Sequence, residues 1–123
     1  MSSEEANFNS IYKEMIANSL FTDRQIYIIY RKLINGKTPS RISRGAYYRQ
    51  IKQCRYKIIG ILYSILLLES IGAVDYKSLS VLETLSRRMG VIAKREQGDI
   101  TDARQAENVM FALRKTLDKM CNV

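Results

Sequence analysis

The stretch Ser43–Leu68, SRGAYYRQIKQCRYKIIGILYSILLL, carries apolar residues at alternating steps of four and three. These residues are Tyr47, Ile51, Cys54, Ile58, Ile61, Ile65 and Leu68. Because an α-helix turns once in about 3.6 residues, this spacing places all of them on one face, as the a/d seam of a coiled coil. Ser43 is a favourable N-cap and Gly72 a favourable stop, so we expect one long helix between them. Its second half is apolar almost all round, and we expect more than one element to cover it.

Helical periodicity continues on both sides of this segment, and the chain has only one Pro and six Gly. We expect helices over residues 4–19, 22–36, 74–97 and 100–120, with a further helix start at Thr38-Pro39. The side chains expected to face inward are Phe8, Ile11, Met15 and Ile16, then Ile26, Ile29, Tyr30 and Leu33, then Leu79, Leu82, Leu85, Met89 and Ile92, and finally Ala103, Ala106, Met110, Leu113, Leu117 and Met120. The predicted fold class is all-α.

Composition argues against most catalytic, metal-binding and membrane classes. The chain has no His, and Cys54 and Cys121 stand apart without a CxxC spacing, which leaves no usual zinc arrangement. No nucleophile–base pair or P-loop is present, so we expect a non-enzyme that needs no cofactor. Residues 1–18 lack the apolar core of a signal peptide, and the apolar run 58–68 is too short to span a bilayer. The expected protein is soluble and cytoplasmic.

The positive charge belongs to one segment. Between Arg24 and Leu68 there are ten Lys or Arg residues and no Asp or Glu; the whole chain is +8, so the remainder is −2. The ten are Arg24, Arg31, Lys32, Lys37, Arg41, Arg44, Arg49, Lys52, Arg55 and Lys57, and they are interleaved with Tyr27, Tyr30, Tyr47, Tyr48 and Tyr56. A compact basic zone with hydrogen-bonding aromatics is typical of a protein that binds a polyanion.

Residues 21–58 resemble the helix-turn-helix of response-regulator output domains and of the promoter-reading region of sigma factors. Three matches carry the resemblance: Phe21, Thr22, Arg24 and Gln25 at the helix start, Gly36-Lys37 after the helix, and Ile42, Ser43 and Gly45 at the start of the reading helix. Only residues 38–41 lie between the last two matches, about six fewer than in those families. The resemblance implies an all-α fold with a helix-turn-helix core, followed here by the long central helix and C-terminal coiled-coil-like helices.

A reading helix that starts at Ser43 presents residues suited to duplex DNA. Its free N–H groups and positive dipole end favour a phosphate, and Arg and Gln pair with guanine and adenine edges in the major groove. Ser43, Arg44, Gly45, Tyr48, Arg49, Lys52 and Gln53 are therefore expected at the groove, with Arg31, Lys32, Lys37 and Arg41 on the DNA backbone. The expected function is transcription regulation or chromatin organisation.

A homodimer is expected because one reading helix gives a short footprint and the chain offers two apolar seams. The residues expected at the dimer contact are Ile58, Ile61, Ile65 and Leu68 in the central helix and Met110, Leu113 and Leu117 in the last. We expect a single domain over 1–123, with the helix-turn-helix and long central helix in 20–72 and the packing and dimerisation region in 74–123. The absence of His and the Ile-, Tyr- and Arg-rich composition point to a thermophilic archaeon or its virus.

Two other functions fit the same residues. The first is a single-stranded DNA or RNA binder in which the tyrosines stack on bases. The second is a helical interaction protein whose basic face docks an acidic partner or an anionic membrane surface. The first predicts that a single strand competes better than a duplex, and the second predicts no duplex binding near physiological salt.

Overall fold

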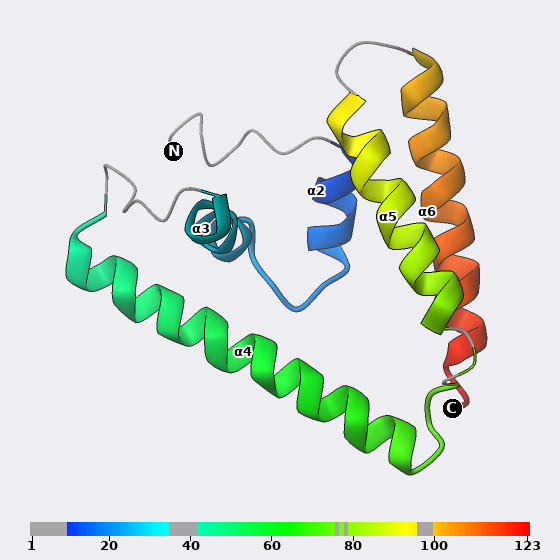
Figure 1. The fold of residues 1–123 in the computed structure, drawn as a ribbon, viewed down its shortest axis with the longest axis horizontal. Coiled ribbons are helices and arrows are strands. Elements are labelled where there is room, and N and C mark those ends of the chain that lie inside the picture. Colours follow the sequence, from blue (N-terminus) through cyan, green and yellow to red (C-terminus); the bar gives the residue numbers. More distant parts are fainter. Residues whose placement is uncertain (1–9, 35–41, 76, 78, 96–99) are drawn as a thin grey trace. The chain divides into compact units, whose positions relative to one another are not determined.

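The computed structural model describes residues 10–34, 42–75, 77, 79–95 and 100–123. Within these ranges the chain forms the helices α2 (Ser10–Ala17), α3 (Asp23–Ile34), α4 (Arg44–Ser70), α5 (Leu79–Arg95) and α6 (Ile100–Met120) (Figure 1). The β-structure in the described residues is one isolated antiparallel bridge between Val74 and Cys121. The expectation of an all-α fold is confirmed.

The chain divides into two compact units, with the division inside α4. One unit contains Lys13–Tyr63, and the other contains Ser64–Val123 together with the first turn of α2. The first holds the helices of the basic segment, and the second is built on α5 and α6.

Helix α3 begins with a reciprocal capping box. The backbone N–H of Gln25 donates to Oγ1 of Thr22 at 3.1 Å, and the backbone N–H of Thr22 donates to Oε1 of Gln25 at 3.0 Å. Two backbone donors at the helix start are satisfied in this way. Asp23 then places a negative charge in the first turn, where the helix dipole favours it.

Helix α4 begins and ends as its sequence predicts. Oγ of Ser43 accepts the backbone N–H of Ala46 at 3.2 Å, which makes Ser43 the N-cap. At the other end Gly72 has a φ of 79°. The N–H of Gly72 donates to the carbonyl of Glu69 at 3.0 Å, and the N–H of Ala73 donates to that of Leu68 at 2.8 Å. This pair of bonds is a Schellman motif, and glycine has the backbone freedom that its left-handed residue requires.

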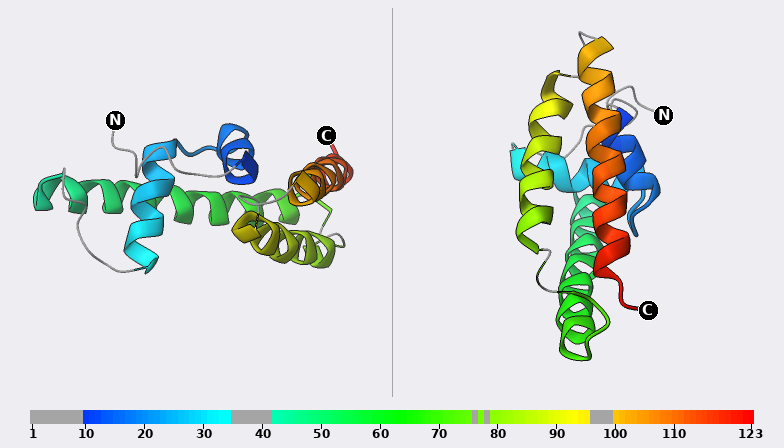
Figure 2. Two further views of the ribbon diagram at one scale, coloured as in Figure 1. Left: turned by 90° about the horizontal axis from the view of Figure 1, so that it is seen from above. Right: turned by 90° about the vertical axis from the view of Figure 1, so that its right-hand side faces the viewer.

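The core of the first unit lies where α3 crosses the first half of α4. Tyr27 and Ile28 of α3 are buried against Tyr47 of α4, with Ile42 and Ile51 packed at the edge. The two helices cross steeply (Figure 2). A steep crossing limits the contact to a short stretch of each helix, so neighbouring residues near the crossing point are buried together.

The stripe predicted for α3 is only partly confirmed for this reason. Ile26 and Ile29 are half-buried, but Tyr30 is 53% exposed and Leu33 is 80% exposed. Both lie beyond the crossing point, where α4 no longer covers α3. The prediction that Tyr30 and Leu33 face the core is wrong, and Tyr27 and Ile28 take that role.

The second unit is an antiparallel pair of helices. Helices α5 and α6 lie side by side in all views (Figures 1 and 2). Leu85 of α5 is buried, as are Ala106, Val109, Met110, Leu113 and Met120 of α6. Val109 is not among the side chains expected inside, whereas Leu117, which is, has 45% of its surface exposed. Helix α5 runs without interruption through Gly90.

A backbone clasp closes the second unit and shortens α5. The N–H of Asp75 donates to the carbonyl of Met120 at 2.7 Å, and the N–H of Asn122 donates to that of Ala73 at 2.9 Å. Nδ2 of Asn122 also donates to the carbonyl of Gly72 at 3.0 Å. Because residues 73–75 pair with the C-terminal end of α6, α5 begins at Leu79 and not at Val74 as the sequence predicts.

Some expectations fall outside the described residues: Phe8, the helix start at Thr38-Pro39, Lys37 and Arg41, together with the side chains of Leu79, Ile92 and Ala103. Among the helices described, none combines the length and apolar character needed to cross a membrane.

Candidate nucleic-acid interface

The first half of α4 has one buried face and one exposed face. Tyr47 and Cys54 are buried and Ile51 is half-buried, and these three residues lie on the side that packs against α3. At about 100° per residue, the intervening positions point away from that core. The exposed residues of this half are Arg44, Gly45, Tyr48, Arg49, Lys52, Gln53, Arg55 and Tyr56, which we call the basic face of α4.

The basic face brings together six of the predicted groove contacts in α4, and Ser43 is exposed at its start. Tyr48 is 57% exposed and Tyr56 66% exposed, so both rings are accessible to a ligand. The small Gly45 leaves open space in the first turn, where an added Cβ would meet only the guanidinium of Arg49 at 3.9 Å. A ligand backbone can therefore approach the start of the helix closely.

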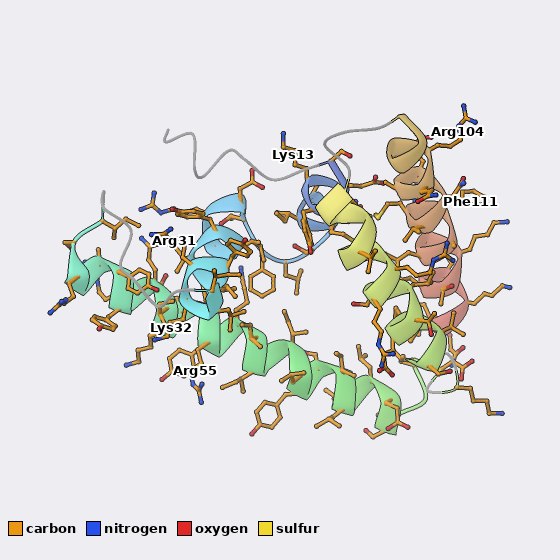
Figure 3. The ribbon with its side chains drawn as sticks, turned by 45° about the horizontal axis from the view of Figure 1, so that its top comes forward. Lys13, Arg31, Lys32, Arg55, Arg104 and Phe111 are labelled. Atoms are coloured by element: carbon orange, nitrogen blue, oxygen red, sulfur yellow. The ribbon has the colours of Figure 1, made fainter. Side chains whose placement is uncertain are left out.

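Two members of the basic face, Arg55 and Tyr56, are not among the predicted site residues. Arg55 projects from α4 on the side away from α3 (Figure 3). It lies seven residues after Tyr48, and Tyr56 lies four residues after Lys52. Helical periodicity from the residues already chosen would have identified both. Nζ of Lys52 lies 5.9 Å from the centre of the Tyr56 ring, a loose cation–π contact that places charge and aromatic surface together.

The basic residues of α3 are less uniform. Lys32 is exposed, but Arg31 is half-buried, and its Nε atom is buried without a hydrogen-bond partner among the described residues. Nε of Arg24 donates to Oε1 of Gln50 at 3.4 Å, which links α3 to α4. Of the two predicted backbone contacts on this helix, Lys32 is therefore open to solvent and Arg31 is partly enclosed.

Lys57 has a structural place and does not belong to the exposed basic set. Its ammonium donates to the carbonyl of Leu20 and to Oε1 of Gln25. The same atom lies 5.3 Å from the centre of the Phe21 ring. These contacts hold the start of α3 against α4, and they direct this charge into the protein.

The electrostatics of the basic face are unbalanced. Among the described residues, no carboxylate forms an ion pair with Arg44, Arg49, Lys52 or Arg55. The first turn of α4 also has no acidic residue that would neutralise the positive end of the helix dipole. Cations that lack internal partners raise the local potential, which draws an anionic ligand to this face.

The thiol of Cys54 lies behind the basic face and does not contribute to it. Burial raises the pKa of Cys54, an effect that the nearby charge of Lys57 partly opposes. Its Sγ donates to the carbonyl of Gln25 at 3.9 Å. In the part of the chain that the structure describes, no group of three His, Cys, Asp or Glu side chains gathers to hold a metal ion.

The residues predicted at a dimer contact divide into two sets. Met110 and Leu113 are buried within the chain itself, so they offer little surface to a second copy. In α4, Ile58, Ile65 and Leu68 are 38–45% exposed and Ile61 is half-buried. Together with Leu117 of α6, these α4 residues remain accessible.

Comparison of this chain with protein-family models, with curated proteins and with solved structures finds no match to any of the three. The function therefore rests on the physical properties of the site.

Proposed function

We propose that this chain is a duplex DNA-binding protein that lays the basic face of α4 against DNA. The observation that carries the proposal is the face itself: one side of a capped helix on which Arg44, Arg49, Lys52 and Arg55 are exposed without acidic partners among the described residues. Neutralisation of phosphates by Lys and Arg releases condensed counterions, which supplies most of the affinity of a protein for DNA.

A helix-turn-helix role for α3 and α4 is part of this proposal. The steep crossing of α3 over the start of α4, with Tyr27, Ile28 and Tyr47 between them, supports it (Figure 2). In such motifs the second helix enters the major groove with its N-terminal residues at the base edges. Arg44 and Arg49 then read bases, while Lys32 contacts the DNA backbone. The protein acts as a homodimer in transcription regulation or chromatin organisation.

A single-strand binder is the second candidate, and the exposure of Tyr48 and Tyr56 is the observation that favours it. Stacking of bases on exposed aromatic rings is tolerant of sequence and prefers unpaired bases. The two candidates differ in which nucleic acid competes better.

Fluorescence-anisotropy titration tests the proposal, with a random duplex and its matching single strand across a salt series. We expect the duplex to bind more tightly, with log K falling against log salt at a slope of about −4 or steeper. Tighter binding of the single strand would assign the site to the tyrosines. Absence of binding by either strand form would overturn both candidates.

A pair of matched variants then locates the interface. Arg49→Gln with Lys52→Gln and Arg104→Gln with Lys115→Gln each lower the net charge from +8 to +6, but the second pair lies on α6. We expect the α4 pair to reduce the magnitude of the salt slope by about 1.8 and the α6 pair to leave it unchanged. Equal effects would mean that overall charge, and not the basic face, binds the DNA.

A further inference from the structure

The second half of α4 exposes a large amount of apolar surface. Eight large apolar side chains there are between 38% and 71% exposed: Ile58, Leu62, Tyr63, Ile65, Leu66, Leu67, Leu68 and Ile71. No Asp, Glu, Lys or Arg occurs from Ile58 to Leu68. Isolated exposed apolar residues are ordinary in proteins, but a contiguous patch of this kind marks an interaction surface.

The most exposed residues of this half do not lie on the seam predicted from the sequence. Leu62, Tyr63 and Leu66 are 55–71% exposed, whereas Ile58, Ile65 and Leu68 of the seam are 38–45% exposed. We call Ile59, Leu62, Tyr63 and Leu66 the apolar stripe of α4. Its members follow one another at steps of three, one and three residues, which keeps them on one side of the helix.

The apolar stripe continues the basic face in helical phase. Leu62 lies seven residues after Arg55, and Tyr63 lies seven after Tyr56 and fourteen after Arg49. Leu66 likewise lies fourteen residues after Lys52. Because seven residues make nearly two turns, residues at this spacing share one side of the helix. One side of α4 is therefore basic in its first half and apolar in its second.

We propose that a second copy of this chain packs on the apolar stripe of α4, so that each dimer carries two basic faces on the continuations of the paired segments. The proposal rests on the proposed function, which it deepens by naming the surface that joins the two DNA-binding helices. The stripe replaces the seam of Ile58, Ile61, Ile65 and Leu68 as the main contact.

Charge and area favour a second copy as the occupant. A stripe without ionised side chains has nothing to select an acidic or basic partner, and it is complementary to itself about a two-fold axis. Full burial of the eight exposed side chains would remove on the order of 800 Å² per chain from water, close to one partner's share of a standard interface. Two-fold pairing also matches a duplex, whose two backbones offer equivalent phosphates to two basic faces.

Sedimentation velocity over a range of about 1 to 100 µM protein, without DNA, tests the contact. The variant combines Leu62→Gln with Leu66→Gln, and its matched control is Leu33→Gln, which makes the same change at the 80% exposed Leu33 of α3. All three positions are largely solvent-exposed and the net charge stays at +8, so neither folding nor long-range charge should account for a difference. Far-UV circular dichroism on the same samples checks that helicity is kept.

We expect the wild type and Leu33→Gln to sediment at twice 14.2 kDa, and the double variant to raise the dimer dissociation constant by at least about tenfold. A wild-type monomer throughout the range, or a double variant as dimeric as the control, would overturn the proposal. Duplex binding by the wild type is scored separately. A chain that dimerises through the stripe but does not bind duplex would retain this inference and lose the proposed function.

Discussion

Nζ of Lys57 donates to Oε1 of Gln25 at 3.1 Å, and the same amide oxygen accepts the backbone N–H of Thr22 at 3.0 Å. The capping box of α3 is thereby tied to a cation on α4, thirty-two residues further along the chain. The ammonium also reaches the carbonyl of Leu20, just before the cap. One side chain thus fixes where α3 begins and how its start is held against α4.

Lys57→Met removes this tie and keeps an unbranched side chain of similar length. We expect a loss of about 1–2 kcal/mol in the free energy of unfolding, because a half-exposed charged donor loses two acceptors. Urea denaturation followed by circular dichroism measures it. The control is Lys52→Met on the basic face, which should change stability by less than about 0.5 kcal/mol. If Lys52→Met costs as much, general charge and not the Lys57 contacts stabilises this region.

The N-caps of α3 and α4 make a second prediction. Thr22→Ala and Ser43→Ala each remove a side-chain oxygen that accepts a backbone N–H, and each should cost about 1 kcal/mol. Thr22→Ser and Ser43→Thr keep the acceptor and should retain most of the stability. Thermal unfolding of the four variants measures the difference. Equal melting temperatures for the Ala and the hydroxyl variants would contradict the assigned caps.

The hydroxyl of Tyr47 gives an opposite prediction. Tyr47 is 1% exposed, and its OH is buried with no hydrogen-bond partner among the described residues. A buried polar group without a partner costs free energy, so Tyr47→Phe should leave the protein as stable as the wild type or more stable by up to about 1 kcal/mol. Tyr47→Leu, which also removes the ring packed near Tyr27 and Ile28, should be clearly destabilising. Destabilisation by Tyr47→Phe of more than about 1 kcal/mol would show that the hydroxyl is bonded.

The two thiols should differ in reactivity. Cys54 is buried and Cys121 is exposed, and burial raises the pKa of Cys54 against a smaller opposing effect of Lys57. We expect Ellman's reagent near neutral pH to modify one thiol per chain quickly and the second only as the protein unfolds, since the thiolate is the reactive form. Cys121→Ser should abolish the fast phase. A fast phase that survives this substitution would place Cys54 at the surface.

The raised pKa of Cys54 also has a sign for stability. The folded state keeps the thiol proton at a pH where the unfolded chain has already lost it. The contribution of this group is therefore fully present below the ordinary thiol pKa of 9.0 and declines as the pH rises above it. Cys54→Ala removes this alkaline dependence, so urea midpoints of the variant measured above pH 9 should fall less steeply with pH than those of the wild type.

Arg49 is the position where base reading is tested. Arg49→Ala should cost about 1–3 kcal/mol at one base pair of a selected site and relax the preference there. Lys32→Ala, an exposed position on α3, should weaken all sequences alike. Competition titrations against single-base variants of the site measure both. Unchanged affinity and preference in Arg49→Ala would remove Arg49 from the reading set.

Local signals in the sequence locate the helices well. Ser43 and Gly72 mark the ends of α4 because a cap depends on residues within one turn of the helix end. The last helix also matches, with α6 at Ile100–Met120 as expected. The predicted start of α5 is wrong because Val74 pairs with Cys121, a contact between residues far apart in the chain that helical periodicity does not contain.

The inward faces are harder to predict than the helices. A periodic stripe identifies a face that can be buried, but the crossing angle decides how much of it is covered, and that angle leaves Tyr30 and Leu33 exposed. In α4 the same limitation hides the apolar stripe, because Leu62 and Leu66 lie beside a seam of equally apolar residues. Only the exposure of each side chain separates the two.

Residue types and their spacing along the chain are enough to establish the helical fold and the concentration of positive charge in one segment. Which of those cations remain available depends on the tertiary fold. Lys57 follows Lys52 by five residues and carries the same charge, yet Lys57 turns inward to the start of α3 while Lys52 stays exposed. The physical reason is that a charge serves structure or ligand according to the acceptors that folding brings within reach, and those acceptors come from another helix.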